Sequence, residues 1–228
     1  MPVFNEAAVI EEVVTAWLRE LERLGIGYEF LAYDDGSRDE SGRILERLGE
    51  QVPGLVVSRQ ANAGHGSTIL RGYREARGDW VFQVDSDDEM GPESFAALWE
   101  QREGYDLLLG ARRERDAPLA RRLITALARI TVWALFGRAV TDVNAPYRLM
   151  RRPCLASLLS AIPAGTFAPN VIISGLAAQR GLRVREIGVP HRGRRTGTVS
   201  IVRWRLWRSA VRAFVQTVTI AVRARGRR

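Results

Sequence analysis

The sequence predicts an α/β fold in which a mostly parallel sheet is flanked by helices. In residues 1–110, short apolar runs alternate with segments whose apolar residues recur at helical spacing, and the connections between them are short. This alternation is typical of parallel strands joined through helices that cover the sheet. Acidic residues also follow directly after two of the apolar runs, and ligands of such folds gather at the carboxyl ends of strands.

The elements expected in the first half alternate along the chain. The expected helices are 7–24, a segment starting at 39 or 41 and ending at 48, 67–76 and 92–101. The expected strands are 28–33, 54–58, 79–84 and 106–110. In the first helix Val13, Trp17 and Leu21 repeat at helical spacing before Gly25 ends it, so one apolar face should pack on the sheet.

The second half is expected to be richer in helix. A long apolar helix, interrupted by Arg129, is expected at 117–136, and it either packs in the core or lies along a membrane interface. The remaining expected elements are a loop at 137–147, helices at 152–162 and 169–181, a strand at 182–190 and a final helix at 201–223.

The final helix has an apolar face and a basic face. The apolar face carries Trp207, Val211, Phe214, Val218 and Val222, and the basic face carries Arg205, Arg208 and Arg212. Such a helix suits the headgroup layer of a membrane. Alternatively, it packs on the domain and turns its arginines to water.

Charge is distributed unevenly along the chain. All 34 basic residues are arginine, and the formal net charge is +8. Residues 1–110 contain 10 Arg and 22 Asp or Glu, residues 111–184 contain 12 and 3, and residues 185–228 contain 12 and 1. The rear half therefore carries solvated arginines or meets something anionic, such as nucleic acid, phosphate groups or a membrane surface.

Cysteine usage and hydropathy exclude several classes of protein. The single cysteine, Cys154, rules out an intramolecular disulfide and a cysteine-based zinc site, which favours a reducing compartment. No apolar run reaches the roughly 18 residues of a membrane-spanning helix, and the first residues lack a signal-peptide pattern. We therefore expect a cytoplasmic protein.

Two acidic clusters follow two of the expected strands. The first acidic cluster is Asp34 and Asp35, and the second runs from Asp85 to Glu89 as DSDDE. At one edge of a parallel sheet the two clusters would repel each other unless a cation compensates them. A hard divalent ion such as Mg²⁺ or Mn²⁺, itself bound to a diphosphate, is the compensation we expect.

Seven short motifs occur along the chain in a recognisable order. They are PVFNE (2–6), DDGSRDES (34–41), NAGHGSTILRGYREARGD (62–79), DSDDE (85–89), GAR (110–112), DVNAPYRLMRR (142–152) and VPHRGRRTG (189–197). In this order they resemble the family 2 glycosyltransferases, most closely the branch of dolichol-phosphate mannose synthase and its bacterial polyprenyl-phosphate relatives. The resemblance spans roughly residues 1–200 and implies a GT-A fold, a nucleotide-sugar donor and a divalent metal.

The resemblance also implies roles for individual residues. The nucleotide sugar would contact Pro2, Phe4, Glu6, Asp34, Asp35, Gly64, Gly66, Asp85, Ser86, Asp87, Arg112 and Arg194. Gly64 and Gly66 would let the backbone approach the nucleotide. The metal would be bound by Asp87 and Glu89, with Asp85 in support. Outside this set, Asp39 is expected to cap a helix and His65 to be a loop residue.

Catalysis is expected from Asp87, Arg112, Arg194 and Asp142. The two arginines would stabilise the leaving diphosphate. A hydroxyl acceptor normally needs a carboxylate base, and Asp142 is the only acid between residues 117 and 185. A phosphate acceptor is already an anion and needs cations instead, which the basic rear half provides.

The reaction expected is therefore metal-dependent, inverting transfer of a sugar to a polyprenyl phosphate, by a peripheral protein on the inner face of the cell membrane. One alternative keeps the donor and moves the sugar to a hydroxyl, with Asp142 as base. A more distant alternative is a non-catalytic nucleotide-binding module. Binding of nucleic acid is not expected, because the basic region lacks a recognisable motif for it.

The chain departs from the branch at two places. Ser200 stands where the branch commonly has a lysine, so Arg203 or Arg195 would have to replace it. Only Met1 precedes Pro2, so the first strand is expected to be short, which puts nucleotide affinity in doubt. The expected domain is 1–200, with a nucleotide-sugar half (1–110) and an acceptor half (111–200), followed by the basic helix within 201–228.

Overall fold

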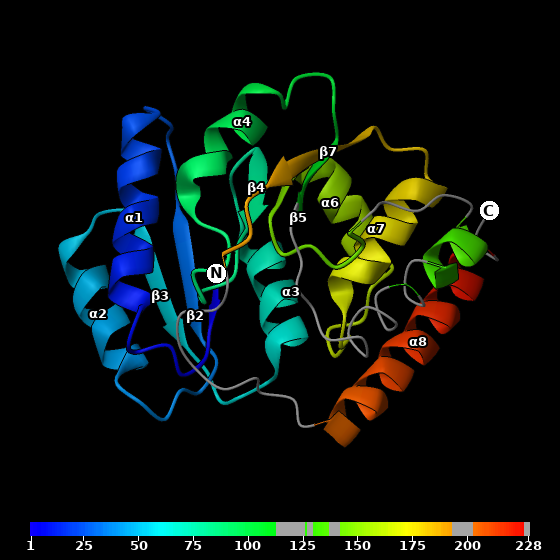
Figure 1. Ribbon diagram of the computed structural model, residues 1–228, viewed down its shortest axis with the longest axis horizontal. Helices are drawn as coiled ribbons and strands as arrows, with labels where there is room; N and C mark the ends of the chain where they lie inside the picture. The colour runs from blue at the N-terminus through cyan, green and yellow to red at the C-terminus, as the bar shows by residue number, and fades with distance from the viewer. Residues whose placement is uncertain (113–125, 127–129, 137–141, 193–202, 226–228) are drawn as a thin grey trace.

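The computed structural model of the chain describes residues 1–112, 126, 130–136, 142–192 and 203–225 (Figure 1). In chain order the elements are β1 (Pro2–Val3), α1 (Ile10–Arg23), β2 (Phe30–Asp34), α2 (Ser41–Gln51), β3 (Leu55–Arg59), α3 (His65–Glu75), β4 (Trp80–Gln83), the 3₁₀ helix η1 (Pro92–Ser94), α4 (Phe95–Glu100), β5 (Leu107–Arg112), β6 (Arg148–Arg151), α6 (Arg152–Leu159), α7 (Pro169–Gln179), β7 (Val184–Val189) and α8 (Arg203–Arg225). Residues 130–136 are also helical.

The described strands form two sheets. β1, β2 and β3 pair in parallel in that order. The second sheet has the order β4-β6-β5-β7, in which β6 runs antiparallel to both neighbours and β5 runs parallel to β7. Parallel pairing predominates and helices flank the strands, so the expected α/β fold is confirmed.

Strand β6 is the element that the sequence does not predict. Its four residues, RLMR, place an arginine at each end, and only Leu149 and Met150 continue the apolar pattern of a strand. Arg148 is fully buried, and its guanidinium donates hydrogen bonds to the main-chain carbonyls of Ala145, Asn170 and Val143 at 2.8, 3.2 and 3.4 Å. A buried charge is tolerated when it is hydrogen-bonded in this way, and these carbonyls come together only in the folded chain.

Two hydrophobic clusters hold the layers together. The first joins the two sheets, and the partly buried Phe82 packs against it, with its ring centroid 5.2 Å from that of Trp17 and 4.8 Å from those of Phe95 and Tyr147. The second joins α3, α6, α7, the helical segment 130–136 and α8. The front and rear halves are therefore packed around continuous apolar contacts.

Helix α8 packs on the domain with a face other than the apolar one expected. Ile220 and Ala221 are buried in the second cluster, whereas Val211, Phe214 and Val222 of the expected apolar face are 61%, 52% and 60% exposed. Of the helix expected at 117–136, residue 126 and residues 130–136 are helical, and the rest lies outside the described residues. Among the described helices, none is long and apolar enough to cross a membrane.

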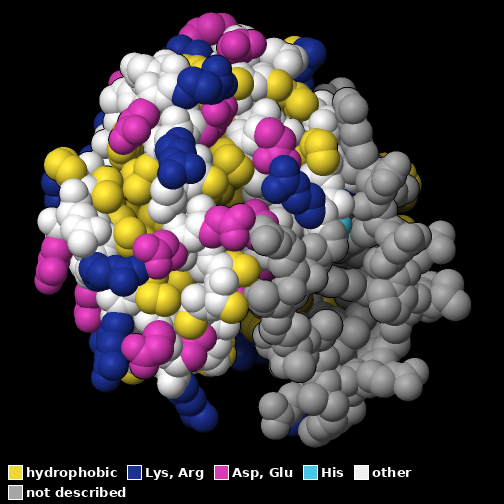
Figure 2. Space-filling model, turned by 60° about the vertical axis from the view of Figure 1, so that its left-hand side comes forward, with side chains coloured by type: hydrophobic (Ala, Val, Ile, Leu, Met, Phe, Trp, Pro, Cys, Tyr) yellow, Lys and Arg dark blue, Asp and Glu magenta, His cyan; other side chains and the backbone are white. Residues whose placement is uncertain are grey.

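The surface on the side of α1 and α2 is mixed in charge. Figure 2 shows acidic and basic side chains interspersed there, with hydrophobic side chains between them. Ion pairs account for part of this mixture, since Arg47 lies 2.6 Å from Glu11 and Arg59 lies 3.1 Å from Glu46. The acidic excess of the front half is therefore partly neutralised on this face.

Candidate functional site

The first turn of α3 connects the two acidic clusters. The main-chain N–H of Gly64 donates to Asp35 Oδ2 at 2.9 Å, and the next residue, His65, places its Nε2 3.1 Å from Asp85 Oδ1. Asp35 follows β2 and Asp85 follows β4, so both clusters lie at the carboxyl ends of strands, as the sequence predicts. The helix N-terminus between them is itself electropositive, which suits an anionic ligand.

The first acidic cluster is buried and shapes the loops around it. Asp35 accepts hydrogen bonds from Gln60 Nε2 at 2.7 Å, from Ala63 N at 2.8 Å and from Gly64 N. Asp34 accepts from Ser37 N at 2.9 Å and from Arg59 Nε at 3.1 Å. These carboxylates therefore fix the loops after β2 and β3 in place.

Gly36 and Gly64 meet the backbone requirements of these loops. Both have positive φ, 76° and 86°, a region that favours glycine. A Cβ at Gly36 would lie 2.8 Å from Asn62 N, so the loops after β2 and β3 pass too close for a side chain. Gly66 likewise lets α3 approach the carbonyls of Thr166 and Phe167, so its close backbone contact is with the rear half of the chain.

The segment after β1 is tied to the loop before α2. Asn5 has a positive φ of 55°, donates its N–H to Ser37 Oγ at 3.0 Å, and accepts from Arg38 N at 2.8 Å through Oδ1. The buried Glu6 donates its N–H to Ser41 Oγ at 2.8 Å. Pro2 is buried in β1, whereas Phe4 is 40% exposed, which leaves its ring open to a ligand.

Asp39 supports the same loop. Its carboxylate accepts hydrogen bonds from Ser41 N at 3.0 Å, Ser41 Oγ at 2.6 Å and Ala7 N at 3.1 Å. Burial favours the neutral carboxyl, but these hydrogen bonds hold the pKa of Asp39 below its ordinary value. Asp39 thus contacts the start of α2, but the N-cap residue of this helix is Glu40 and not Asp39 as expected.

Asp85 belongs to a polar network that enters the core. Its Oδ1 accepts from Gln83 Nε2 at 3.1 Å, and Gln83 Oε1 in turn accepts from Tyr73 OH at 2.7 Å and from Asn170 Nδ2 at 2.9 Å. Burial opposes ionisation of Asp85, but His65 and Gln83 hold the pKa of its carboxyl below the ordinary value. Asp85 is therefore a fixed anion. Ser86, the next residue, is buried.

The rest of the second acidic cluster contacts the segment after β7. Asp87 Oδ1 accepts from Glu89 N at 3.2 Å, and Asp88 between them has a positive φ of 57°. Glu89 Oε2 lies 3.0 Å from His191 Nε2, and the Glu89 carbonyl accepts from Arg192 N at 2.8 Å. Arg194 lies outside the described residues, two positions beyond this contact.

Arg112 and Asp142 form a buried ion pair. Arg112 Nε donates to Asp142 Oδ2 at 2.6 Å and Arg112 Nη2 donates to Oδ1 at 3.1 Å, in the bidentate geometry that arginine and carboxylates favour. Their side chains are 7% and 9% exposed. Arg112, which is expected at the diphosphate, is thus paired with Asp142, which is expected as the base if the acceptor is a hydroxyl. Both Asp142 oxygens are engaged by this arginine.

Metal-binding chemistry is present only in part. Within the described ranges, no three His, Cys, Asp or Glu side chains converge in a group that could hold a metal ion. Asp85 and Asp87 nevertheless offer the oxygen ligands that Mg²⁺ and Mn²⁺ prefer, and Mg²⁺ is commonly held by one or two carboxylates together with substrate phosphates. The donor set therefore fits an ion that arrives with a diphosphate.

Comparison with known proteins identifies the family. A model of "Glycosyl transferase family 2" matches residues 1–158, more than half of the chain. The chain belongs to glycosyl transferase family 2. The family that the motifs indicated is therefore confirmed, and the matched region contains both acidic clusters, Arg112 and Asp142.

Two curated relatives of this family 2 chain have the same name. The undecaprenyl-phosphate 4-deoxy-4-formamido-L-arabinose transferase of Pseudomonas aeruginosa (strain LESB58) is 32% identical over 202 residues, which cover 86% of this chain and 58% of the relative. The enzyme of the same name from Salmonella paratyphi B is 28% identical over 200 residues, which cover 86% and 60%. The chain thus spans about three fifths of the length of these relatives.

Solved structures confirm the fold of the family 2 chain. A glucosyl-3-phosphoglycerate synthase from Mycobacterium tuberculosis, in complex with Mn²⁺, uridine diphosphate and phosphoglyceric acid, matches with a TM-score of 0.71 at 19% identity, covering 96% of this chain and 76% of that one. The same enzyme with phosphoglyceric acid alone matches with a TM-score of 0.69. The similarity confirms the α/β GT-A-like fold.

Three site contacts involve residues to which the sequence analysis gives no role in the site. His65, expected as a loop residue, opens α3 and contacts Asp85; His191 contacts Glu89; and Gln83 orients Asp85. Gln83 does leave a signal in the sequence, because it is a polar residue inside the apolar run DWVFQV. The two histidines are the only ones in the chain, and both contact the second acidic cluster.

Proposed function

We propose that the chain is the catalytic part of an inverting glycosyltransferase that moves a sugar from a nucleoside diphosphate to a polyprenyl phosphate. The observation that carries this proposal is the junction of the two acidic clusters at the first turn of α3, in a member of glycosyl transferase family 2. The names of the curated relatives support undecaprenyl phosphate as the acceptor.

The front half binds the donor. Phe4 offers an exposed ring for the base, and the loops fixed by Asp34 and Asp35 form the wall beside it. The same edge of the sheet is lined by four further residues, which fix the position of the backbone there: Pro2, Glu6, Gly64 and Gly66. Ser86 follows Asp85 at the point where the diphosphate approaches, and Arg194 supplies positive charge to the diphosphate.

Asp87 and Asp85 would hold a divalent ion at the donor site, together with Glu89 once that carboxylate leaves His191. When bound, the ion supplies Lewis-acid stabilisation of the leaving diphosphate. The Mn²⁺ and uridine diphosphate named for the structural neighbour support this assignment, and either Mg²⁺ or Mn²⁺ suits the oxygen ligands.

The Arg112–Asp142 pair favours a phosphate acceptor. A hydroxyl nucleophile needs a carboxylate with an oxygen available to take its proton. Arg112 engages both oxygens of Asp142, so Asp142 serves to orient Arg112 rather than to act as a base. A phosphate monoester is already anionic and attacks the anomeric carbon without a base, with inversion.

Exposed apolar side chains suit a membrane-borne acceptor. Ile130 and Trp133 are 59% and 63% exposed, and Figure 1 draws their segment beside α8, whose Val211, Phe214 and Val222 are also exposed. Monomeric soluble proteins rarely expose large apolar patches unless the patch binds a partner or a membrane. These residues let the protein bind peripherally to the inner face of the membrane, where the acceptor phosphate lies.

A paired acceptor assay tests the proposal. Nucleotide sugars are screened with Mn²⁺ or Mg²⁺ against a short polyprenyl phosphate and against the matching polyprenol, and products are identified by mass. We expect product only with the phosphate. Product with the polyprenol instead would assign the hydroxyl alternative and return Asp142 to the role of base.

Vesicle sedimentation tests the membrane surface separately. Phe214→Ser combined with Val222→Ser should weaken binding to anionic vesicles by about tenfold or more, because each exposed side chain loses the free energy of its transfer into lipid. Val56→Ser, which removes a similarly exposed side chain from β3, is the matched control. Equal binding by all three proteins would remove α8 from the membrane contact.

A further inference from the structure

Helix α7 carries two polar side chains in its buried part. Residues 169–177 of this helix are all buried, and among them only Asn170 and Ser174 have polar side chains, four positions apart on one face. Ser174 Oγ donates to the Val143 carbonyl at 3.0 Å. Burying an amide is costly unless it is hydrogen-bonded, so the partners of Asn170 indicate what this side chain does.

The side-chain partners of Asn170 lie in the front half of the chain. Asn170 Nδ2 donates to Gln83 Oε1 at 2.9 Å, and Asn170 Oδ1 lies 3.0 Å from Tyr73 OH. Arg148 Nη1 donates to the main-chain carbonyl of Asn170 at 3.2 Å and so holds the first turn of α7. Asn170 therefore reaches from α7 to the last residue of β4.

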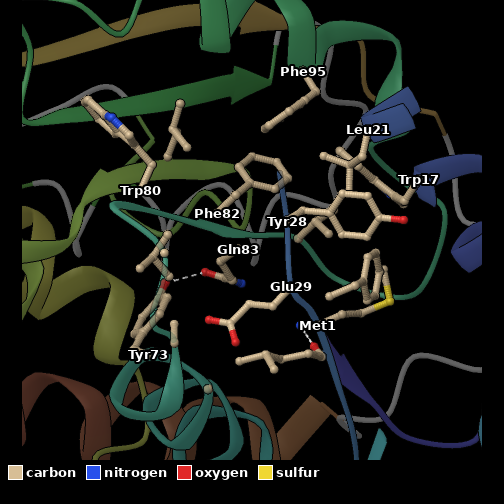
Figure 3. Close-up of a pocket in the computed structure, with 18 of the residues that line it drawn as sticks. Met1, Trp17, Leu21, Tyr28, Glu29, Tyr73, Trp80, Phe82, Gln83 and Phe95 are labelled. Carbon is tan, nitrogen blue, oxygen red and sulfur yellow. Dashed lines mark hydrogen bonds between the residues drawn. The ribbon is translucent and has the colours of Figure 1, made fainter. Parts of the chain in front are cut away.

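The Gln83 amide satisfies its neighbours in one orientation. A glutamine amide has a donor end and an acceptor end. Asn170 Nδ2 and Tyr73 OH both donate to Gln83 Oε1, and burial raises the pKa of Tyr73, so its hydroxyl keeps the proton. Gln83 Nε2 is thereby turned to Asp85 Oδ1 at 3.1 Å. Figure 3 shows the Gln83 oxygen directed at Tyr73 and the Gln83 nitrogen directed away from it.

The hydrogen bond from Gln83 fixes the rotation of the Asp85 carboxylate. In the described part of the chain, Gln83 Nε2 and His65 Nε2 both contact Oδ1 of Asp85 at 3.1 Å. With Oδ1 held, Oδ2 also has a fixed direction, and groups that hydrogen-bond a metal-binding carboxylate orient it for the ion. A reversed Gln83 amide would turn its own oxygen to Asp85 and repel it.

Packing alone does not account for an asparagine at position 170. A leucine of similar size would fill the same space without the cost of burying an amide. The side chains of Tyr73, Gln83 and Asn170 are buried, whereas that of Asp85 is 26% exposed. The hydrogen-bonded chain thus leads out of the core and ends at the second acidic cluster.

We propose that Asn170 is a positioning residue of the donor site, which acts through the Gln83 amide to hold the Asp85 carboxylate in place for a divalent cation. This role rests on the proposed function, in which Asp85 helps to bind the ion. It gives the rear half of the chain a part in the donor site, although the sequence predicts a nucleotide-sugar half at residues 1–110.

Nucleotide binding with and without Mn²⁺ tests this role. UDP and, separately, GDP are titrated calorimetrically into the full chain, and the ratio of the affinities with and without Mn²⁺ measures the contribution of the metal. For Asn170→Leu we expect this ratio to fall about fivefold, while binding without Mn²⁺ stays unchanged. Ser174→Ala removes the other buried side-chain hydrogen bond of α7 and is the matched control, which should leave the ratio unchanged.

A double-mutant cycle tests whether Asn170 acts through Gln83. Gln83→Leu alone should lower the ratio at least as much as Asn170→Leu, and combining the two changes should lower it no further, because the connection is already broken. Replacing both hydrogen-bonding partners by apolar groups keeps the core filled, so the double variant should fold. Thermal unfolding of the four proteins checks this.

The possible failures of these tests are distinguishable. The same ratio in the parent chain and in Asn170→Leu would overturn the role of Asn170 and leave the proposed function intact. A further fall when Asn170→Leu is added to Gln83→Leu would contradict the route through Gln83. If Mn²⁺ strengthens the binding of neither nucleotide to the parent chain, the proposed metal site fails, and the role of Asn170 fails with it.

Discussion

The carboxylates of the first acidic cluster are buried and accept hydrogen bonds from the main-chain N–H groups of the surrounding loops as well as from Arg59 and Gln60, whereas those of the second are partly exposed and contact two histidines. Asp34 and Asp35 are 0% and 3% exposed, while the Asp85 and Glu89 side chains are 26% and 19% exposed. The histidines that contact the second cluster can swing away, but the amides around Asp35 cannot without unfolding a loop. We therefore propose that the first cluster is structural and that the second contacts the ligand.

The largest effect should come from Asp87→Asn. Asparagine keeps the oxygen that accepts from Glu89 N but removes the charge, so turnover should fall by about 10³-fold while Tm stays unchanged. Steady-state kinetics and thermal unfolding measure the two quantities. Activity within a few fold of the parent chain would remove Asp87 from the metal site.

Asp35→Ala should act mainly on stability. Gln60, Ala63 and Gly64 would each lose a buried acceptor, at a cost of about 3 kcal/mol, or a fall in Tm of roughly 6–12 °C. The matched variant Asp85→Ala removes a partly exposed carboxylate and should cost about 1 kcal/mol. Equal losses of stability in the two variants would contradict the conclusion that the first cluster is the more important for stability.

Gln83→Leu should reduce both activity and stability moderately. The change removes a donor to Asp85 and the acceptor for Tyr73 and Asn170, so we expect turnover to fall about tenfold and stability to fall about 2 kcal/mol. Gln60→Leu, which removes a donor from Asp35, should lower stability with less effect on turnover. Comparing turnover in the two variants tests whether the orientation of a carboxylate matters more for catalysis in the second cluster than in the first.

The smallest effect should be the pH dependence of Asp39. Its pKa is lowered in the folded chain, so its hydrogen bonds contribute stability above the ordinary value of 3.8, and this contribution is lost as the pH falls through the folded pKa. Because Asp39 is exposed, we expect less than about 1 kcal/mol. Chemical denaturation of the parent and of Asp39→Asn between pH 5 and pH 3 measures it. Parallel curves would show that Asp39 contributes nothing.

The sequence predicts the sheet edge better than it predicts the contacts across it. The ends of β2 and β4 follow from local apolar runs, so Asp34, Asp35 and Asp85 could be assigned to that edge. The pairing of Glu89 with His191 joins residues 102 positions apart, and that of Arg112 with Asp142 joins residues 30 positions apart. Such contacts depend on how the elements pack, which no local pattern encodes.

Strand β6 and its buried Arg148 also depend on packing that no local pattern encodes. An arginine at each end of RLMR favours a surface turn on composition alone. Arg148 is buried because its guanidinium donates to the carbonyls of Val143 and Ala145 in the preceding segment and to the carbonyl of Asn170 in α7, which reaches it only in the folded chain. Local pattern therefore misses the strand whose apolar run is interrupted by a buried charge.

The contacts of Gln216 bear on how far the chain can be shortened. Gln216 Oε1 accepts from Phe167 N at 2.8 Å, and the carbonyls of Thr166 and Phe167 lie against Gly66 at the start of α3. With Ile220 and Ala221 in the shared core, α8 is linked through these contacts to the start of α3, beside the proposed donor site. A protein cut at residue 200 would uncover apolar surface on α7 and should be prone to aggregate, so solubility screens should retain α8.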